Sequence, residues 1–303
     1  MSRIHEALKK AEQERAGTQA VPLETSPVGE MPGMAAPAAT TGVMSGAAAA
    51  PQLSTQFTFD ALLARCTPAN WQPRADTMLF FHQQEHSLGM EEFRTLRSRL
   101  YQMREKMPLK KLLISSSLPK EGKSFVAANL AQVMVKQHGR RALLIDADLR
   151  GPKLHDCLGA PNTPGLSDYL MGQADEFSVM QRGPMENLFF IPAGTTVTTP
   201  AELVANGRLK FLLSRVESLF DWIIIDSPPA VPVSDASLLA NFCDGVLLVV
   251  RSNVTPFDVA RKARSEFRDK QLVGVVLNGM DESGLAYSSY YYGYGQKNET
   301  AKN

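Results

Sequence analysis

Six continuous apolar runs alternate with helical patterns along this chain, and the alternation restricts the fold more than any other feature. The runs are typical of buried parallel strands, and they lie at residues 111–116, 142–147, 188–192, 222–227, 245–250 and 272–278. The helical patterns lie at about 88–105, 123–137, 200–218, 234–241 and 256–268. Repeated strand–helix–strand units predict an α/β fold, a doubly wound and mostly parallel sheet. In such sheets the ligand binds beyond the carboxyl ends of the strands.

A phosphate-binding loop is indicated directly after the first of these strands. The segment SLPKEGKS, Ser117–Ser124, separates that strand from the next helical pattern, which is the context such a loop requires. Backbone N–H groups would converge on the phosphates, Lys123 would reach the β and γ oxygens, and the Ser124 hydroxyl would hold Mg²⁺. Lys120 stands where glycine is often found, and a residue other than glycine is tolerable there if its φ stays negative.

Acidic residues follow two other strands. Asp146 and Asp148 end the second run, with Arg150 just beyond them, and Asp226 ends the fourth. A single aspartate at a strand end is as often a helix cap as a metal ligand. Three aspartates at the same edge of the sheet favour a Mg²⁺–nucleotide site. The sequence therefore predicts ATP and Mg²⁺ as cofactors.

Composition excludes several other classes. The net charge is +1, from 32 basic and 31 acidic residues, so nothing global attracts the chain to nucleic acid. The 3 cysteines have no metal-site or disulfide-framework spacing, which indicates a reducing compartment. We find no run of membrane-spanning length and no secretory signal. We expect a cytoplasmic protein that reaches the inner face of the plasma membrane only through a partner.

The chain divides into four predicted regions. Residues 1–16 form a charged helix, and 17–76 a flexible low-complexity linker in which 56–76 carries several aromatic and aliphatic residues of unassigned role. Residues 77–282 form the nucleotide-binding domain. Residues 283–303 form a disordered tail that is rich in tyrosine. The tail tyrosines are Tyr287, Tyr290, Tyr291, Tyr292 and Tyr294.

These motifs together resemble the bacterial tyrosine kinases of capsule and exopolysaccharide biosynthesis. That family combines a Walker A loop, a DxDxR element and a DxxP Walker B, matched here by SLPKEGKS, by Asp146–Arg150 and by Asp226–Pro229. The segments CDGVLLVVR, GVVLNG and PAGTTVTTPAELV also fit, with Thr199 where asparagine is usual. The likeness covers roughly residues 85–295 and implies a P-loop NTPase related to the deviant Walker ATPases.

The resemblance also implies roles for particular residues. Asp146, Lys123 and Asp148 would be catalytic, and Asp146, Ser124 and Asp226 would hold Mg²⁺. Glu91, Arg94 and Arg97 fit the family's ExxRxxR element and would form subunit contacts in a ring. The nucleotide-binding residues would be Pro119, Lys120, Glu121, Gly122, Lys123, Ser124, Phe125 and Arg150.

The predicted function is that of a protein-tyrosine autokinase that phosphorylates its own tail in trans. The family's partners would be a membrane-embedded polysaccharide co-polymerase that activates it and a tyrosine phosphatase. Two alternatives remain open on sequence grounds. A partition or division-site ATPase shares the fold, although its loop carries a second lysine where Leu118 stands here. A non-catalytic ATP-binding switch would need the same residues.

Overall fold

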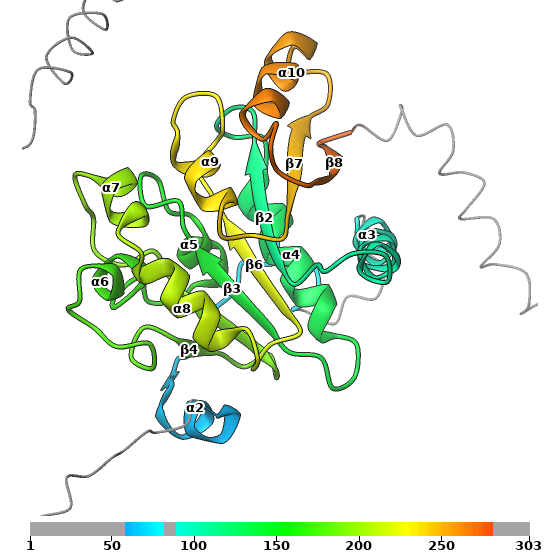
Figure 1. Ribbon diagram of the computed structural model, residues 1–303. Helices are drawn as coiled ribbons and strands as arrows, with labels where there is room; N and C mark the ends of the chain where they lie inside the picture. Colours follow the sequence, from blue (N-terminus) through cyan, green and yellow to red (C-terminus); the bar gives the residue numbers. More distant parts are fainter. Residues whose placement is uncertain (1–57, 82–88, 281–303) are drawn as a thin grey trace, which may run out of the picture. The chain divides into compact units, whose positions relative to one another are not determined.

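The computed structural model describes residues 58–81 and 89–280, and in them one eight-stranded sheet forms the centre of the fold (Figure 1). The strands are β1 (Thr67–Pro68), β2 (Lys111–Ser116), β3 (Ala142–Asp146), β4 (Gln181–Arg182), β5 (Leu188–Ile191), β6 (Trp222–Asp226), β7 (Gly245–Arg251) and β8 (Leu272–Asn278). Their order is β1-β4-β5-β3-β6-β2-β7-β8, and only β4 and β5 pair antiparallel. The predicted fold class is confirmed.

Helices cover both faces of the sheet, each over its own hydrophobic core. The helices are α2 (Phe59–Arg65), α3 (Met90–Arg104), α4 (Lys123–Val135), α5 (Leu154–Leu158), α6 (Leu166–Leu170), α7 (Pro200–Ala205), α8 (Arg208–Val216), α9 (Asp235–Ala240) and α10 (Phe257–Glu266). Helices α3, α4 and α5 pack on one face, and α2, α6, α7, α8, α9 and α10 on the other. The central strands are buried on both sides, which explains why they are apolar without alternation.

The three strands that carry the predicted motifs are neighbours in the sheet. β6 lies between β3 and β2, with Asp146 paired to Asp226 and Ile114 paired to Asp226 in the parallel register. Because parallel strands end at the same edge, the loop after β2 and the aspartates of β3 and β6 share one edge of the sheet. The fold therefore brings the predicted motifs together.

Most predicted elements occur within a residue or two of their expected limits, with one clear exception. The helix predicted over 200–218 is two helices, α7 and α8. They separate at Gly207, which has a φ of +85°. This angle ends helical geometry, and residues with a side chain rarely adopt it.

The predicted linker boundary at residue 76 is wrong, because residues 58–81 pack on the sheet and its helices. We call them the N-terminal arm. The Trp71 side chain is buried, makes an edge contact with Phe190 at 6.1 Å, and donates from Nε1 to Gln181 Oε1 at 3.3 Å. Further along, Leu79 N–H donates to Asn129 Oδ1 on α4 at 2.8 Å. The described aromatic residues of that segment, Phe59 and Trp71, therefore pack in the domain core.

The helix predicted at 1–16, most of the linker and the tyrosine-rich tail lie outside the described residues. Among helices of the described ranges, none has the length and apolarity that crossing a membrane requires.

Candidate nucleotide and metal site

The loop Ser117–Ser124 joins β2 to α4 and adopts a conformation that needs two positive φ angles. Gly122 has a φ of +95°, and a Cβ there would come within 2.0 Å of Asn278 Nδ2, so glycine is required. Lys120 has a φ of +66°, so the condition of a negative φ at this position is not met. A lysine in this region costs free energy, which the contacts around the loop must offset.

Side chains from β7, β8 and the turn after β7 hold the loop in place. The buried Glu121 carboxylate accepts from Leu118 N–H at 2.9 Å and from the Thr255 hydroxyl. Asn278 Nδ2 donates to the Glu121 carbonyl at 2.9 Å, and Arg251 donates to the Lys120 carbonyl at 3.5 Å. The loop is therefore preorganised by elements more than 100 residues later in sequence, the separations being 131, 134 and 157 positions.

Two carboxylates, both fully buried, stand side by side at the ends of β3 and β6. Asp146 accepts from the N–H groups of Lys153 and Leu154 at 3.2 and 3.1 Å through Oδ2, and from Asp148 N–H at 3.2 Å through Oδ1. Asp226 Oδ2 accepts from the Ser124 hydroxyl at 2.5 Å. These contacts fix Asp146 to the loop after β3 and the start of α5, and Asp226 to the start of α4.

Lys123 brings the positive charge to this cluster. Its Nζ lies 2.8 Å from Asp148 Oδ2 and 3.4 Å from Ser124 Oγ. Burial by itself lowers the pKa of Lys123, but the carboxylates of Asp226 and Asp148 outweigh burial and raise the pKa to about 12. The ammonium therefore stays charged at neutral pH.

The pKa values of the two buried aspartates lie above the ordinary value of an aspartate side chain. Burial raises the pKa of Asp146, and repulsion from Asp226 raises it further. Burial also raises the pKa of Asp226, against the opposing effect of Lys123 and the Ser124 hydroxyl. A carboxylate with a raised pKa binds a proton more readily than an ordinary one, which suits Asp146 to accept one.

The donors present fit Mg²⁺ together with a nucleotide. Asp226 Oδ1 and Ser117 Oγ are buried, and neither makes a hydrogen bond within the protein. Such orphaned oxygens are uncommon and are accounted for when a bound ion or ligand meets them. In the described ranges no set of three or more His, Cys, Asp or Glu side chains could hold a metal alone. A Mg²⁺ here would take its other ligands from phosphate and water.

Three other predicted nucleotide-binding residues differ in where their side chains lie. Arg150 makes a two-pronged ion pair with Asp235, at 2.8 and 3.0 Å, which fixes its guanidinium to the start of α9. The Phe125 ring packs edge-on against Phe93 at 5.9 Å, against the core between α3 and α4. Pro119 is exposed on the loop. These positions argue against side-chain contacts from Arg150 or Phe125 to phosphate.

The three residues predicted for subunit contacts lie on α3 but do not form one free charged face. Arg94 pairs with Glu91 on the same helix, and both side chains are exposed to solvent, by 41% and 72%. Arg97 instead donates to the Val133 carbonyl on α4 at 2.9 Å. Glu91 and Arg94 are therefore the solvent-exposed members of the set, whereas Arg97 is held against α4.

Sequence reasoning missed Asp235, Thr255 and Asn278 as residues of the site. Asn278 lies in the GVVLNG segment, but no sequence pattern indicates which group its side chain contacts. Asp235 is separated from Arg150 by 85 positions, and no spacing rule links them. All three support the loop or the DxDxR element through contacts that only the folded chain creates.

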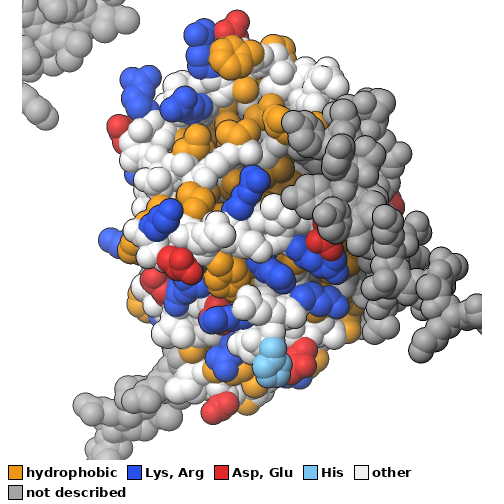
Figure 2. All heavy atoms as spheres, turned by 90° about the vertical axis from the view of Figure 1, so that its right-hand side faces the viewer, with side chains coloured by type: hydrophobic (Ala, Val, Ile, Leu, Met, Phe, Trp, Pro, Cys, Tyr) orange, Lys and Arg blue, Asp and Glu red, His pale blue; other side chains and the backbone are white. Residues whose placement is uncertain are grey.

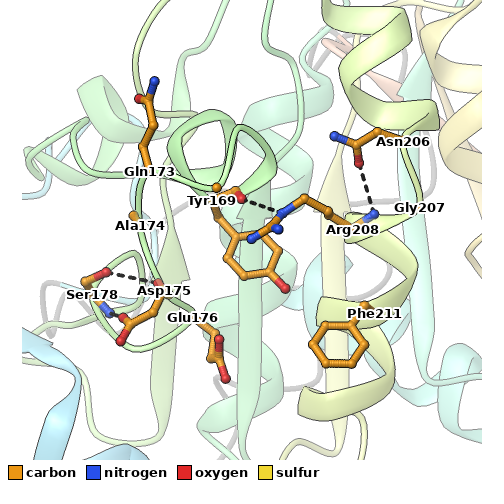
Figure 3. A pocket seen from close by; sticks show the side chains of 11 residues that line it. Tyr169, Gln173, Ala174, Asp175, Glu176, Ser178, Asn206, Gly207, Arg208 and Phe211 are labelled. Carbon is orange, nitrogen blue, oxygen red and sulfur yellow. Dashed lines mark hydrogen bonds between the residues drawn. The ribbon is translucent and has the colours of Figure 1, made fainter.

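A pocket of about 720 Å³ lies away from this site, between α6 and α8 (Figure 3). Arg208 lies on the Tyr169 ring there, with its guanidinium carbon 5.0 Å from the ring centre, and donates to the Tyr169 carbonyl at 2.9 Å. None of the predicted site residues lines this pocket.

Comparison with known proteins agrees with the geometry. A family profile described as "ParA: NUBPL iron-transfer P-loop NTPase" matches residues 109–301. Fold and site thus define a P-loop NTPase of the ParA type. Two bacterial tyrosine-protein kinases match over most of their own length. YwqD of Bacillus subtilis is 36% identical over 68% of this chain and 87% of that protein, and CpsD of Streptococcus agalactiae is 32% identical over 63% and 84%.

The same family appears among longer proteins and solved structures. The tyrosine-protein kinase wzc of Salmonella typhimurium is 33% identical over 68% of this chain, which matches 29% of wzc. The kinase domain of the Escherichia coli tyrosine kinase ETK superposes with a TM-score of 0.63 and 29% identity, over 68% of this chain and 81% of that one. The chimerical protein CapA2B2 gives 0.64 and 29%, over 74% and 98%. The chain belongs to the family of bacterial tyrosine-protein kinases.

Proposed function

We propose that this chain is an ATP- and Mg²⁺-dependent protein-tyrosine autokinase that phosphorylates its own tail tyrosines in trans. One observation carries the proposal: a preorganised phosphate loop stands next to two buried carboxylates and a charged lysine. Phosphoryl transfer passes through a loose transition state, so positioning and charge neutralisation are what the protein must supply.

Each residue has a definite task in this proposal. Lys123 binds the β and γ oxygens of ATP, and the loop N–H groups together with the N-terminus of α4 bind the phosphates. Ser124 and Asp226 would hold Mg²⁺, which would neutralise charge that develops on the phosphates. The tyrosine oxygen bonds to the γ phosphorus as the bond from phosphorus to the ADP oxygen breaks. Asp146 accepts the proton of the tyrosine hydroxyl.

The acceptors in this proposal are Tyr287, Tyr290, Tyr291, Tyr292 and Tyr294. Five tyrosines within eight positions of one chain are well explained as substrate, because a tyrosine kinase needs accessible tyrosine hydroxyls as acceptors. Delivery in trans needs an oligomer, and the exposed Glu91 and Arg94 are the best-supported contact residues of a ring.

The proposed cellular context follows from the resemblance. The chain would act at the cytoplasmic face of the plasma membrane, recruited by a membrane-embedded polysaccharide co-polymerase that activates it. A tyrosine phosphatase would oppose it. Among the relatives is a protein of Klebsiella pneumoniae named as a tyrosine-protein kinase in the cps region, which is consistent with a role in polysaccharide export.

The experiment is to incubate the purified full chain with ATP and Mg²⁺ and to quantify phosphotyrosine and inorganic phosphate together. A kinase transfers phosphate to tail tyrosines, and free phosphate is the minor product. Phosphate release without phosphotyrosine would instead identify an ATPase. Binding of ATP with neither product, in the presence of the activator's cytoplasmic segment, would identify a non-catalytic switch.

A further inference from the structure

Exposed apolar side chains gather at the β8 end of the sheet. The described residues include seven large hydrophobic side chains that are exposed. Five of them lie on β8, just after it, or in the turn and helix that precede it. These five are Val254, Phe257, Val275, Leu277 and Met280, and we call them the β8 patch. Their exposed fractions run from 44% to 78%, so they project from the surface and mark a place of interaction.

The members of the β8 patch lie on neighbouring elements. Ser252 N–H donates to the Asn278 carbonyl at 2.8 Å, which holds the turn after β7 against the end of β8. That turn carries Val254, Phe257 begins α10 directly after it, and Met280 follows the end of β8. The other two members lie two positions apart on β8 and therefore share one face of the strand. Figure 2 views this side of the molecule, where hydrophobic side chains lie among lysines and arginines.

The segment that carries the β8 patch is also the basic part of the chain. Residues 251–280 hold 6 basic and 3 acidic side chains, out of 32 and 31 in the whole chain. This segment therefore carries a net charge of +3, and the rest of the chain carries −2. The overall charge of +1 conceals this separation, which gives one end of the sheet an attraction for anions that the whole chain lacks.

Helix α10 places part of this charge beside the patch. Phe257, Arg261 and Arg264 stand at positions i, i+4 and i+7, so a patch phenylalanine and two arginines share one face of the helix. Arg261 pairs with Asp258 at 2.8 Å, but the two side chains are exposed by 69% and 81%, and exposed pairs contribute little. Arg264 forms no ion pair with another described residue. Both guanidinium groups are therefore available to an anionic surface.

We infer that the β8 patch and this face of α10 bind the surface of an anionic lipid bilayer. The projecting apolar side chains would enter the boundary between headgroups and acyl chains. The arginines would meet the lipid phosphates while their aliphatic stems lie along the apolar boundary. The inference goes beyond phosphoryl transfer and adds a direct lipid contact to the proposed recruitment through a partner. Two such contacts on one molecule strengthen each other, because the second forms at a high effective concentration.

The form of the surface favours lipid over a protein partner. The five apolar side chains project, whereas a stable protein interface buries its anchors in fitted pockets. Phosphate headgroups can accept from guanidinium groups in many arrangements, so exposed and mobile arginines suffice. A protein partner would instead need carboxylates at matching positions. Charge together with projecting apolar groups is the combination by which peripheral proteins bind membranes.

The test is co-sedimentation of the purified full chain with vesicles, without ATP. One set of vesicles is phosphatidylcholine alone, and the other has equal parts of phosphatidylcholine and phosphatidylglycerol. The chain should bind the anionic vesicles at least about tenfold more tightly than the neutral ones, since several basic side chains face the headgroups. The preference should be lost in about 1 M salt, where the Debye length is about 3 Å.

The apolar contribution is tested by Phe257→Ser combined with Leu277→Ser. This pair should weaken binding to anionic vesicles by at least about tenfold, the scale of withholding apolar side chains from the acyl boundary. Phe211→Ser is the matched control, because Phe211 is a second exposed phenylalanine and lies on α8 at the separate pocket. It should leave vesicle binding unchanged.

The basic contribution is tested by Arg261→Gln combined with Arg264→Gln, which should also weaken binding by at least about tenfold. Arg182→Gln combined with Lys210→Gln removes the same charge from exposed positions on β4 and α8. This control pair should change binding by less than about twofold, because both positions lie outside the β8 end of the sheet.

Several results would overturn the inference. One is equal binding to neutral and anionic vesicles, or no binding to either. Another is a loss in the control variants as large as in the patch variants. A third is unchanged vesicle binding in the patch variants with a new oligomer size in light scattering, which would make the patch a subunit interface. A fourth is unchanged vesicle binding with lost binding of the activator's cytoplasmic segment, which would make it a protein-docking site.

The vesicle assay separates failure of the inference from failure of the proposed function, because lipid binding needs no phosphoryl transfer. If the anionic vesicles bind as expected and no phosphotyrosine forms with ATP and Mg²⁺, the kinase assignment fails alone. If phosphotyrosine forms normally and the chain binds no vesicles, the lipid inference fails alone.

Discussion

The Lys123 ammonium lies 2.8 Å from Asp148 Oδ2, so the lysine of the phosphate loop is tied to the loop that follows β3. The pair is almost completely buried, with side-chain exposures of 12% and 7%. It holds the lysine beside the two carboxylates at the strand ends. The DxDxR element therefore positions the phosphate loop as well as supplying Asp146.

Lys123→Met should abolish tail phosphorylation and weaken ATP binding by at least about tenfold, because it removes the charge that meets the phosphates. Isothermal titration with ATP and immunodetection of phosphotyrosine measure the two effects. Lys136→Met, an exposed lysine at the other end of α4, is the control and should behave as the unaltered chain. Normal ATP affinity in Lys123→Met would place the phosphates elsewhere.

Arg150→Ala should destabilise the fold by about 1–3 kcal/mol, because it leaves the buried Asp235 carboxylate without its partner. Urea unfolding measures the loss. Arg261→Ala breaks an exposed pair with Asp258 and should cost less than about 1 kcal/mol. If Arg150→Ala proves as mild as Arg261→Ala yet weakens ATP binding, then Arg150 contacts nucleotide and the ion pair is incidental.

Asp226→Asn should stabilise the protein at pH 8 by about 1–2 kcal/mol when Mg²⁺ and nucleotide are absent. The folded-state pKa of Asp226 is raised to about 6, so its contribution to stability is complete below the unfolded pKa and is lost as pH rises through about 6. The neutral amide avoids that loss. The gain should therefore shrink as pH falls from 8 toward 4, as measured by thermal melts across this range.

Asp221→Asn is the control for this comparison, because its effect on the stability at pH 8 should have the opposite sign. Burial alone would raise the pKa of Asp221, but the Arg141 N–H and the Arg140 guanidinium overcome it and lower the pKa. Its contribution is present above the unfolded pKa and is lost as pH falls. Asp221→Asn should therefore destabilise at pH 8. If Asp226→Asn is less stable than the unaltered chain at pH 8, the claim that burial of the Asp226 carboxylate destabilises the folded protein at that pH is contradicted.

Trp71→Ala should destabilise the domain by about 3–5 kcal/mol, because the indole is buried in the core of the α3–α4 face. Urea unfolding of the full chain measures this cost. Asn70→Ala, at the exposed neighbouring position, should be nearly neutral. If the two variants are equally stable, Trp71 does not stabilise the domain, and the N-terminal arm belongs to the flexible linker that the sequence predicted.

The sequence predicted the central strands well because their apolar runs are continuous and bounded by turn-forming residues. It also placed Lys123, Asp146 and Asp226 at one edge of the sheet, since parallel topology alone requires this. It could not predict β1 and β4, which are two residues long and depend on each other for pairing. Their stability comes from tertiary contacts, which leave no periodic signal.

Contacts within the site were less predictable than its position. The positive φ of Lys120 occurs next to Glu121, which is held by Thr255 from the turn after β7 and by Asn278 from β8. The ion pair between Arg150 and Asp235 could not be predicted for a similar reason. A charged side chain near a phosphate loop suggests a phosphate contact, but an aspartate brought close by the fold competes for the same guanidinium.

The central claim is that Asp146 and the phosphate loop transfer phosphate to the tail, and Asp146→Asn tests it most directly. Mass spectrometry of residues 287–294 after incubation with ATP and Mg²⁺ should show phosphotyrosine in the unaltered chain. In Asp146→Asn the initial rate should fall by roughly 10²–10⁴-fold, the scale of losing a positioned base. ATP should still bind, and the exposed control Asp156→Asn should keep full activity. An Asp146→Asn chain that phosphorylates its tail at the unaltered rate would contradict the account.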